Sequence, residues 1–226
     1  MKNNNETPLV SVLLPVYNVE LYIEEALCSI LNQTYTNFEC IVIDDASTDR
    51  TVQIIESVKD DRIVLIKKEK NTGYTKNLNE GIKLCKGKYI ARMDGDDISY
   101  PERFQKQVHF LEENTDIVLC GTQYKVIGRD KYSHHPTNHD ELKVKLITGS
   151  YIAHPSVMMR ASVLKDNELL YDETMEPAED HDLWSKMVFL GKVANLNEVL
   201  LEYRVHANQV SQVRKQQQLK VSSDIK

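Results

Sequence analysis

The sequence lacks several features that would place it in a class at once. It contains no C-x-x-C pair and no excess of basic over acidic residues, and it falls short of the run of about 20 apolar residues that a membrane helix needs. Its net charge is −6, with both signs interspersed, whereas a nucleic-acid-binding protein normally presents a basic face. The cysteines are widely spaced, which favours reduced, packed thiols in a cytosolic protein over a zinc site or a disulfide framework: Cys28, Cys40, Cys85 and Cys120.

The first eight residues also lack the apolar core of a signal peptide, and we expect residues 1–8 to be disordered. Apolar content of 41% and charged content of 27% are ordinary for a soluble globular protein. A chain of 226 residues is long enough to bury a substantial core in one large domain.

Short apolar runs with β character alternate with helical patterns over the first ninety or so residues. The predicted strands are too apolar to have one solvated face, which is typical of a parallel sheet covered by helices on both sides. We predict strands over 9–15, 38–43, 62–66 and 88–93, and helices over 20–32, 51–58 and from Gly73 to Gly87. The second half is expected to hold helices over 101–114 and 141–148, strands over 117–127 and 154–159, a helix opened by 179–182, and a polar tail from 207.

An acidic turn follows the strand predicted over 88–93. Asp94, Asp96 and Asp97 place three carboxylates in four positions, and Gly95 supplies backbone freedom for the turn. Carboxylates so close raise one another's pKa unless a cation neutralises them, and Mg²⁺ or Mn²⁺ prefers such oxygen ligands. The alternative is an acidic surface turn before the helix that begins at Pro101.

Ligands of parallel sheets bind beyond the carboxyl ends of the strands. Those ends here are Pro15-Val16-Tyr17-Asn18, Asp44-Asp45 and the acidic turn, so an aromatic ring and two groups of acids converge on one edge. Glu179-Asp180-His181-Asp182 adds more ionisable residues in a first helical turn than stabilisation of the helix dipole requires. The histidines of 129–140 have no regular spacing and are interpreted as solvated loop residues.

Taken in order, these pieces resemble the inverting, metal-dependent, nucleotide-sugar glycosyltransferases of family 2, which have the GT-A fold. The resemblance covers about 9–211 and is carried by Pro15-Val16-Tyr17-Asn18, Asp44-Asp45-Ala46-Ser47-Thr48-Asp49, Asn71-Thr72-Gly73, Asn79-Glu80-Gly81, Asp94-Gly95-Asp96-Asp97, His154-Pro155-Ser156, Glu179-Asp180-His181-Asp182-Leu183-Trp184 and Tyr203-Arg204-Val205-His206. It implies an α/β fold with a mostly parallel twisted sheet, a nucleotide-sugar-binding half over 9–97, and an acceptor and catalytic half over 98–206. The polar composition of 207–226 predicts either a mobile tail or a truncated helix.

The resemblance also implies roles for single residues. Tyr17 stacks on the nucleotide base and Asp45 accepts the uracil N3–H, so the donor is a UDP-sugar. Asp96, Asp94, Asp97 and His206 are the implied metal ligands, for Mn²⁺ or Mg²⁺. Asp94 and Asp96 also count among the donor contacts, with the donor ribose as the alternative partner of Asp94. The alternatives for Asp97 and His206 are an orienting role and a contact with the diphosphate, respectively. Further donor contacts are assigned to Pro15, Asn18, Asn71, Gly95, Arg204 and, because Leu78 stands where many members have arginine, Lys76.

Catalysis implied by the resemblance is a single in-line displacement at the anomeric carbon. Asp180 takes the acceptor proton, Glu179 contacts sugar hydroxyls, and His154 and Trp184 shape the acceptor side. The implied product is a hexosyl or N-acetylhexosaminyl unit on a saccharide or lipid-linked acceptor, as in bacterial surface polysaccharide synthesis. The implied location is the cytoplasm or the inner face of the membrane, with peripheral contact.

Three alternatives are weighed against this interpretation. A sugar-phosphate nucleotidyltransferase would need a Gly-rich loop after the first strand, and Pro15-Val16-Tyr17-Asn18 has no glycine. A receiver-type signalling domain would need an acidic pair there and is about half as long. A protein of the same fold that binds sugar nucleotides without turnover stays open.

Overall fold

The computed structural model describes residues 7–207, 209 and 213–225. One sheet runs through the protein. Its strands are β1 (Val10–Val16), β2 (Phe38–Asp44), β3 (Ile63–Lys67), β4 (Tyr89–Arg92), β5 (Ile98–Ser99), β6 (Ile117–Val126), β7 (Met158–Arg160) and β8 (Lys192–Tyr203). Its strand order is β3-β2-β1-β4-β7-β6-β8-β5, and the neighbours in β3-β2-β1-β4 are all parallel. The mostly parallel sheet confirms the predicted fold class.

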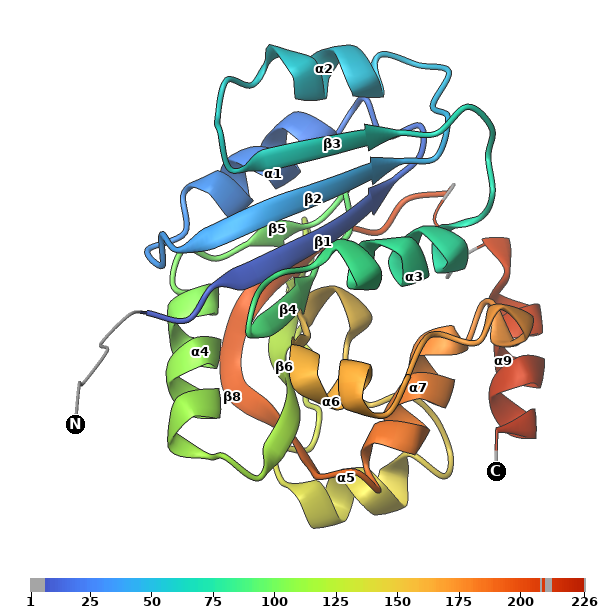
Figure 1. The fold of residues 1–226 in the computed structure, drawn as a ribbon. Helices are drawn as coiled ribbons and strands as arrows, with labels where there is room; N and C mark the ends of the chain where they lie inside the picture. The colour runs from blue at the N-terminus through green and yellow to red at the C-terminus, as the bar shows by residue number, and fades with distance from the viewer. Residues whose placement is uncertain (1–6, 208, 210–212, 226) are drawn as a thin grey trace.

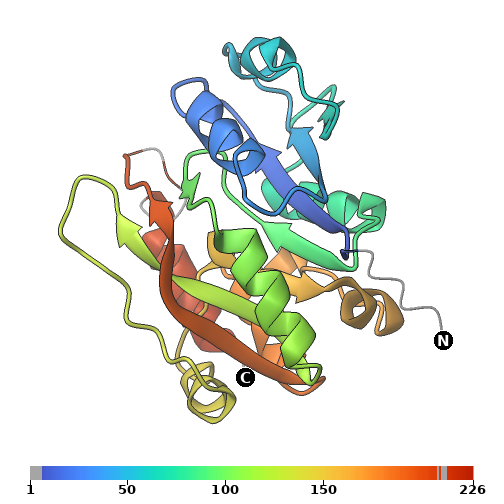
Figure 2. The ribbon, with the colours of Figure 1, turned by 90° about the vertical axis from the view of Figure 1, so that its left-hand side faces the viewer.

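Helices cover both faces of this sheet (Figures 1 and 2). They are α1 (Ile23–Leu31), α2 (Thr51–Ser57), α3 (Tyr74–Leu84), α4 (Arg103–Glu113), α5 (His139–Lys145), α6 (Ala161–Asp166), α7 (Glu179–Met187) and α9 (Lys215–Asp224), with 3₁₀ turns η1 (His154–Ser156) and η2 (Glu173–Met175). No helix in the described part of the chain has the length and apolar character needed to cross a membrane.

Alternating side chains of β1 divide the core into two layers. Val12 and Leu14 pack with α1 on one face, whereas Leu13 packs with α3 on the other. Gly81 lets α3 approach the sheet closely, since a Cβ there would lie 2.1 Å from Leu13 Cδ1. Both faces of the strand are therefore buried, as its continuous apolar run predicts.

Two local predictions are wrong. The strand predicted over 154–159 is the 3₁₀ turn η1 followed by the shorter β7, because Pro155 lacks an N–H for a ladder and fits the first turn of a helix instead. Gly95 does not adopt a positive φ. It is needed for space, since a Cβ at this position would lie 2.8 Å from Val16 Cγ1.

Both chain ends extend beyond the described residues. Residues 1–6 of the segment expected to be disordered lie outside them, as do 208, 210–212 and 226 of the expected tail. Within the described part, α9 is held against α7 by a 2.6 Å hydrogen bond between Ser222 Oγ and His181 Nδ1. Gln218 also donates to the Pro177 carbonyl at 2.9 Å.

Candidate active site

A cleft of about 890 Å³ opens at the carboxyl ends of β1, β2 and β4. The cleft is also lined by η1, by the start of α7 and by the segment after β8. Most of the predicted site residues line it: Pro15, Tyr17, Asn18, Asp45, Asn71, Asp94, Gly95, Asp96, His154, Glu179, Asp180 and His206. Lys76, Asp97, Trp184 and Arg204 do not line it.

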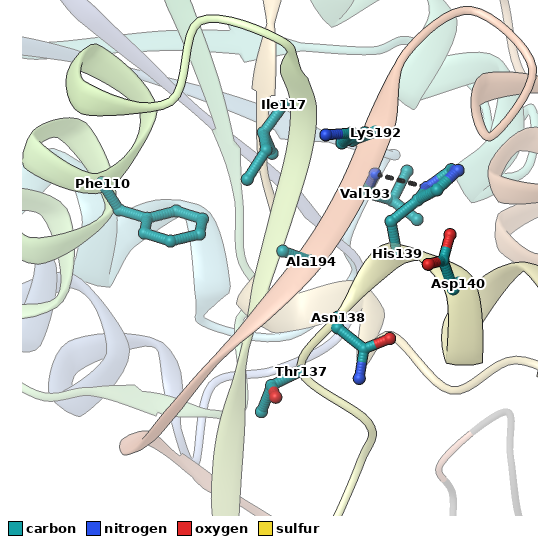
Figure 3. A pocket seen from close by; sticks show the side chains of 9 residues that line it. All are labelled: Phe110, Ile117, Thr137, Asn138, His139, Asp140, Lys192, Val193 and Ala194. Atoms are coloured by element: carbon teal, nitrogen blue, oxygen red, sulfur yellow. Dashed lines mark hydrogen bonds between the residues drawn. The ribbon is translucent and has the colours of Figure 1, made fainter.

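A second cavity, of about 300 Å³, lies away from this cleft between α4, β6, β8 and the start of α5 (Figure 3). His139, predicted as a solvated loop residue, is instead the first residue of α5, lines this cavity and accepts a hydrogen bond from the Val193 N–H at 3.2 Å. This cavity contains none of the predicted site residues.

The acidic turn at the end of β4 gathers the three predicted carboxylates. Asp94, Asp96 and Asp97 each offer an oxygen, and these atoms lie within 4.8 Å of one another. His206 Nε2 lies 2.8 Å from Asp96 Oδ2, and Arg92 pairs with Asp94 at 2.5 Å. Burial, and next the charge of Asp94, raise the pKa of Asp96, and burial with both neighbouring acids raises the pKa of Asp97 well above its usual range.

These residues fit a hard divalent cation. The donors are carboxylate oxygens with one imidazole beside them, which is the ligand chemistry of Mg²⁺ and Mn²⁺. Asp97 Oδ2 is buried and has no hydrogen-bond partner among the described residues, so this oxygen lacks the compensation that burial of a carboxylate requires.

Asp97 and Arg204 lie behind the turn and form part of its support. Asp97 is fully buried and accepts the Arg204 backbone N–H at 2.8 Å. The Arg204 guanidinium donates to the Asp96 carbonyl at 2.7 Å and to Glu25 of α1 at 2.5 Å, and it stacks over the Tyr22 ring at 4.8 Å. Arg204 therefore ties the acidic turn to α1, with its charge already paired.

The other edge of the cleft is built around Asp45. Its carboxylate accepts the backbone N–H groups of Thr72 at 2.8 Å and Gly73 at 3.0 Å, which fixes the loop before α3. Gly73 has φ 93°, a conformation that favours glycine. The neighbouring Asn18 accepts the Thr48 N–H at 2.8 Å, and the half-exposed Tyr17 ring lies at the mouth of the cleft. An aromatic face and a carboxylate thus border the same space.

Glu179 is buried at the start of α7, where the helix dipole stabilises negative charge. The Tyr74 hydroxyl donates to Glu179 Oε2 at 2.5 Å, and His154 Nδ1 lies 3.7 Å from Oε1. Burial, and next the charge of Asp180, raise the pKa of Glu179 to about 8. At neutral pH this carboxyl therefore retains its proton to a large extent.

Asp180, the next residue, faces the cleft. It accepts the Ser150 hydroxyl at 3.2 Å, and burial raises the pKa of its carboxyl. A carboxylate with a raised pKa is a stronger base than one in water, which suits proton abstraction. Asp180 and Asp96 thus line the same cleft.

His154 and Trp184 belong to an aromatic group under this wall. His154 Nε2 lies 2.8 Å from the Tyr171 hydroxyl, and the Trp184 ring meets His154 edge-on at 5.7 Å between centroids. Trp184 is fully buried, so it supports the wall from inside. Burial, and next the charge of Arg92, lower the pKa of His154 well below its usual range.

Lys76 lies apart from the predicted donor contacts. Its ammonium group is half-exposed and pairs with Glu173 at 3.7 Å on the outside of α3. Lys76 stands two residues before Leu78, a rotation of about 200° around α3, and its side chain does not line the cleft.

Sequence reasoning missed several residues that the fold brings to the site. Arg92 is buried and pairs with Asp94, and a charge in an apolar strand directly before three acids was a usable signal. Tyr74 and Ser150 gave no such signal, because each hydrogen-bonds an acid far along the chain. Arg214, just before α9, lines the cleft and pairs with Glu176 at 2.6 Å.

The mostly parallel sheet with helices on both faces matches the fold of solved GT-A glycosyltransferases. Residues 11–167 match the model of the family described as Glycosyl transferase family 2. The chain belongs to this family, which confirms the prediction from the sequence.

Relatives of known sequence agree with this assignment. An uncharacterized glycosyltransferase of Haemophilus influenzae is 36% identical over 233 residues, covering 97% of this chain and 72% of that protein. The uncharacterized glycosyltransferase MJ1057 of Methanocaldococcus jannaschii is 34% identical, covering 96% of this chain and 78% of that protein.

Solved structures with the same fold include complexes with nucleotides. S. aureus TarS 1-349 in complex with UDP is 26% identical with a TM-score of 0.73, covering 88% of this chain and 61% of that one. The mannosyltransferase PcManGT from Pyrobaculum calidifontis, in complex with GDP-Man and Mn²⁺, is 19% identical with a TM-score of 0.75, covering 96% of this chain and 64% of that one. The chain thus spans less than two thirds of these solved chains.

Proposed function

We propose that this glycosyltransferase moves a hexosyl or N-acetylhexosaminyl unit, with inversion, from a UDP-sugar to a hydroxyl of a saccharide or lipid-linked acceptor. The observation that carries the proposal is that Asp96 and Asp180 line the same cleft of about 890 Å³. A cleft of this size accommodates a nucleotide-sugar together with part of an acceptor.

The nucleotide end of the donor is assigned to the β1 and β2 edge. Tyr17 offers a stacking face for the base, and Asp45 retains acceptor capacity on a carboxylate that already orders the Asn71-Thr72-Gly73 loop. The UDP found with the similar TarS supports the choice of uridine. Arg204 and Lys76 are assigned a smaller part in donor binding, because their charged groups already pair with Glu25 and Glu173.

Mn²⁺ or Mg²⁺ would be held by Asp94 and Asp96, with Asp97 and His206 beside them. Such an ion supplies charge stabilisation to the departing diphosphate. Arg92 holds Asp94 in place, and Arg204 holds the backbone of Asp96.

Proton transfer is assigned to Asp180. Its Oδ2 accepts the Ser150 hydroxyl, which fixes the carboxylate while leaving the other oxygen for the acceptor O–H. The acceptor oxygen attacks the anomeric carbon as its proton moves to Asp180, and the bond from that carbon to the diphosphate breaks. Glu179, kept mainly protonated, can donate a hydrogen bond to a sugar hydroxyl.

The setting that we propose is surface polysaccharide synthesis in the cytoplasm or at the inner face of the membrane. A sugar-nucleotide-binding protein without turnover is the second candidate, because binding would need the same cleft. A nucleotidyltransferase is the weaker one, since the loop after β1 has no glycine to cradle a triphosphate.

A donor panel with a product assay tests the proposal. Thermal shifts with UDP-, GDP- and dTDP-sugars in Mn²⁺ should single out one UDP-sugar, and Asp96→Ala should abolish that shift. Release of free UDP with a saccharide acceptor would separate turnover from silent binding. Stabilisation by no nucleotide-sugar in the unaltered protein would refute both candidates.

A further inference from the structure

An exposed apolar surface lies where the end of α5 meets the end of α7. We define the α5–α7 surface by Val144, Ile147, Phe189 and Leu190, which are 66%, 74%, 75% and 41% exposed. Single exposed apolar side chains are ordinary, but a group of large ones marks an interaction site. In Figure 1 these helix ends lie at the lower end of the molecule, opposite α2.

Lys143 joins the two parts of this surface. Its ammonium nitrogen lies 5.1 Å from the centroid of the Phe189 ring. Lys143 and Ile147 are four residues apart, and Val144 and Ile147 three, on a helical turn that continues through the Ile147 N–H bond to the Val144 carbonyl at 3.2 Å. The members of the surface are therefore neighbours in space.

The same helix is anchored by its other side. Leu142 and Leu146 are buried in the core cluster that holds Trp184, so α5 cannot rotate its exposed residues inward without losing that packing. The outward face of α5 is therefore fixed in an exposed position.

Cations accompany the apolar side chains. Lys143 lies over Phe189 and Lys145 over the Tyr151 ring at 5.3 Å, and neither forms an ion pair with a carboxylate within the described part of the chain. The nearby Lys186 and Lys192 are paired with acids, and the acids of α5 itself occupy its first turn.

We infer that the α5–α7 surface docks on an anionic lipid bilayer. Aromatic and aliphatic side chains can enter the region between headgroups and acyl chains, while lysines reach up to lipid phosphates. The net charge of −6 opposes binding to an anionic membrane by the rest of the chain, so binding needs a local surface of this kind.

Docking here would bring the catalytic wall close to the bilayer. His181 of α7 donates to the Leu146 carbonyl at 2.7 Å, and Ser150, three residues after Ile147, bonds Asp180. The inference does not require the proposed transfer reaction, because vesicle binding is measured without a donor.

Sedimentation with vesicles provides the test. The unaltered protein should bind vesicles of phosphatidylcholine with 30% phosphatidylglycerol (a ratio chosen on the order of natural anionic content) and bind pure phosphatidylcholine weakly. Lys143→Gln with Lys145→Gln should weaken binding by about 25-fold, about fivefold for each lysine. Ile147→Ser with Phe189→Ser should abolish it.

Matched controls separate the surface from general charge and apolarity. Leu21 is 76% exposed near α1, and Lys59 and Lys83 are exposed elsewhere, so Leu21→Ser and Lys59→Gln with Lys83→Gln should leave binding unchanged. Every variant should keep the melting temperature and the donor-induced thermal shift of the unaltered protein.

Failure to bind anionic vesicles, or equal loss in the control variants, would overturn the inference. A dimer in light scattering that Ile147→Ser with Phe189→Ser dissociates, without vesicle binding, would instead assign the surface to a second copy of the chain. Loss of the donor-induced shift in Asp96→Ala, by contrast, concerns only the proposed function.

Discussion

Asp180→Asn tests the assignment of the base most directly. Asparagine has the same shape, and its amide oxygen can still accept the Ser150 hydroxyl, so the wall of the cleft should keep its structure. The variant removes the group that takes the acceptor proton. General base catalysis contributes about 10²- to 10⁴-fold, which corresponds to about 3 to 5 kcal/mol of activation free energy.

The structure also predicts what this variant does to stability. The charge of Asp180 helps to raise the pKa of Glu179, and burial raises the pKa of Asp180 itself, so ionising this pair costs free energy at neutral pH. Removing one charge should leave the free energy of unfolding unchanged or raise it. A loss of activity through unfolding is therefore not expected.

The assay compares UDP release with donor affinity for Asp180→Asn. The kcat should fall at least about 100-fold, while the affinity for UDP-sugar with Mn²⁺ changes less than about twofold. Asp182→Asn is the matched control, because Asp182 lies on the same helical turn but pairs with Lys186 at 2.6 Å and does not line the cleft. A variant that keeps most of its kcat, or that loses donor binding, would mean that the base is elsewhere.

Further predictions concern the acidic turn and its surroundings. His206→Asn should weaken Mn²⁺ binding about tenfold while Asp96→Asn removes it, and chelation of the metal should stop transfer; calorimetry with Mn²⁺ checks the order of these effects. Between about pH 4.5 and pH 8 the unaltered protein should lose stability as pH rises, because Glu179 ionises in the unfolded chain while the folded carboxyl keeps its proton. In Glu179→Gln the free energy of unfolding, measured with urea at several pH values, should fall less steeply with pH. Glu25→Gln and Arg204→Gln should both lower the affinity for Mn²⁺ several-fold, because Glu25 holds the Arg204 side chain that supports the acidic turn. An unchanged affinity would indicate that Arg204 acts on the donor directly.

The convergence of motifs at one edge was predictable from the sequence. The apolar runs that end at Pro15, Asp44 and Met93 belong to neighbouring parallel strands, and parallel strands bring their carboxyl ends to one edge. The acidic turn, the Asp45 loop and the Tyr17 segment therefore meet without any information on side-chain contacts. That the start of α7 lies at the same cleft was predicted only from the family resemblance, since its apolar spacing alone predicts a helix and not its position.

What the sequence could not supply is the state of each charge. Arg204 and Lys76 are both cations beside predicted donor motifs, yet one pairs with Glu25, 179 residues away along the chain, and the other with Glu173. A motif fixes residue identity and order, whereas the partner of a long side chain depends on packing between distant elements. The same reason hides Tyr74, whose hydroxyl meets Glu179 across 105 residues.

The charged partners of the acidic turn indicate where unfavourable electrostatic energy remains in the site. Arg204 holds the backbone of the acidic turn, and Arg92 and His206 each pair with one oxygen of Asp94 and Asp96, respectively, yet burial and the charge of Asp94 still raise the pKa of Asp96. A fold that neutralised these oxygens internally would lose affinity for a cation, because a ligand would then have to displace an existing pair. The unfavourable charge is thus kept on the side that a metal and diphosphate would face, so stability and donor binding should rise together when Mn²⁺ is added with UDP-sugar.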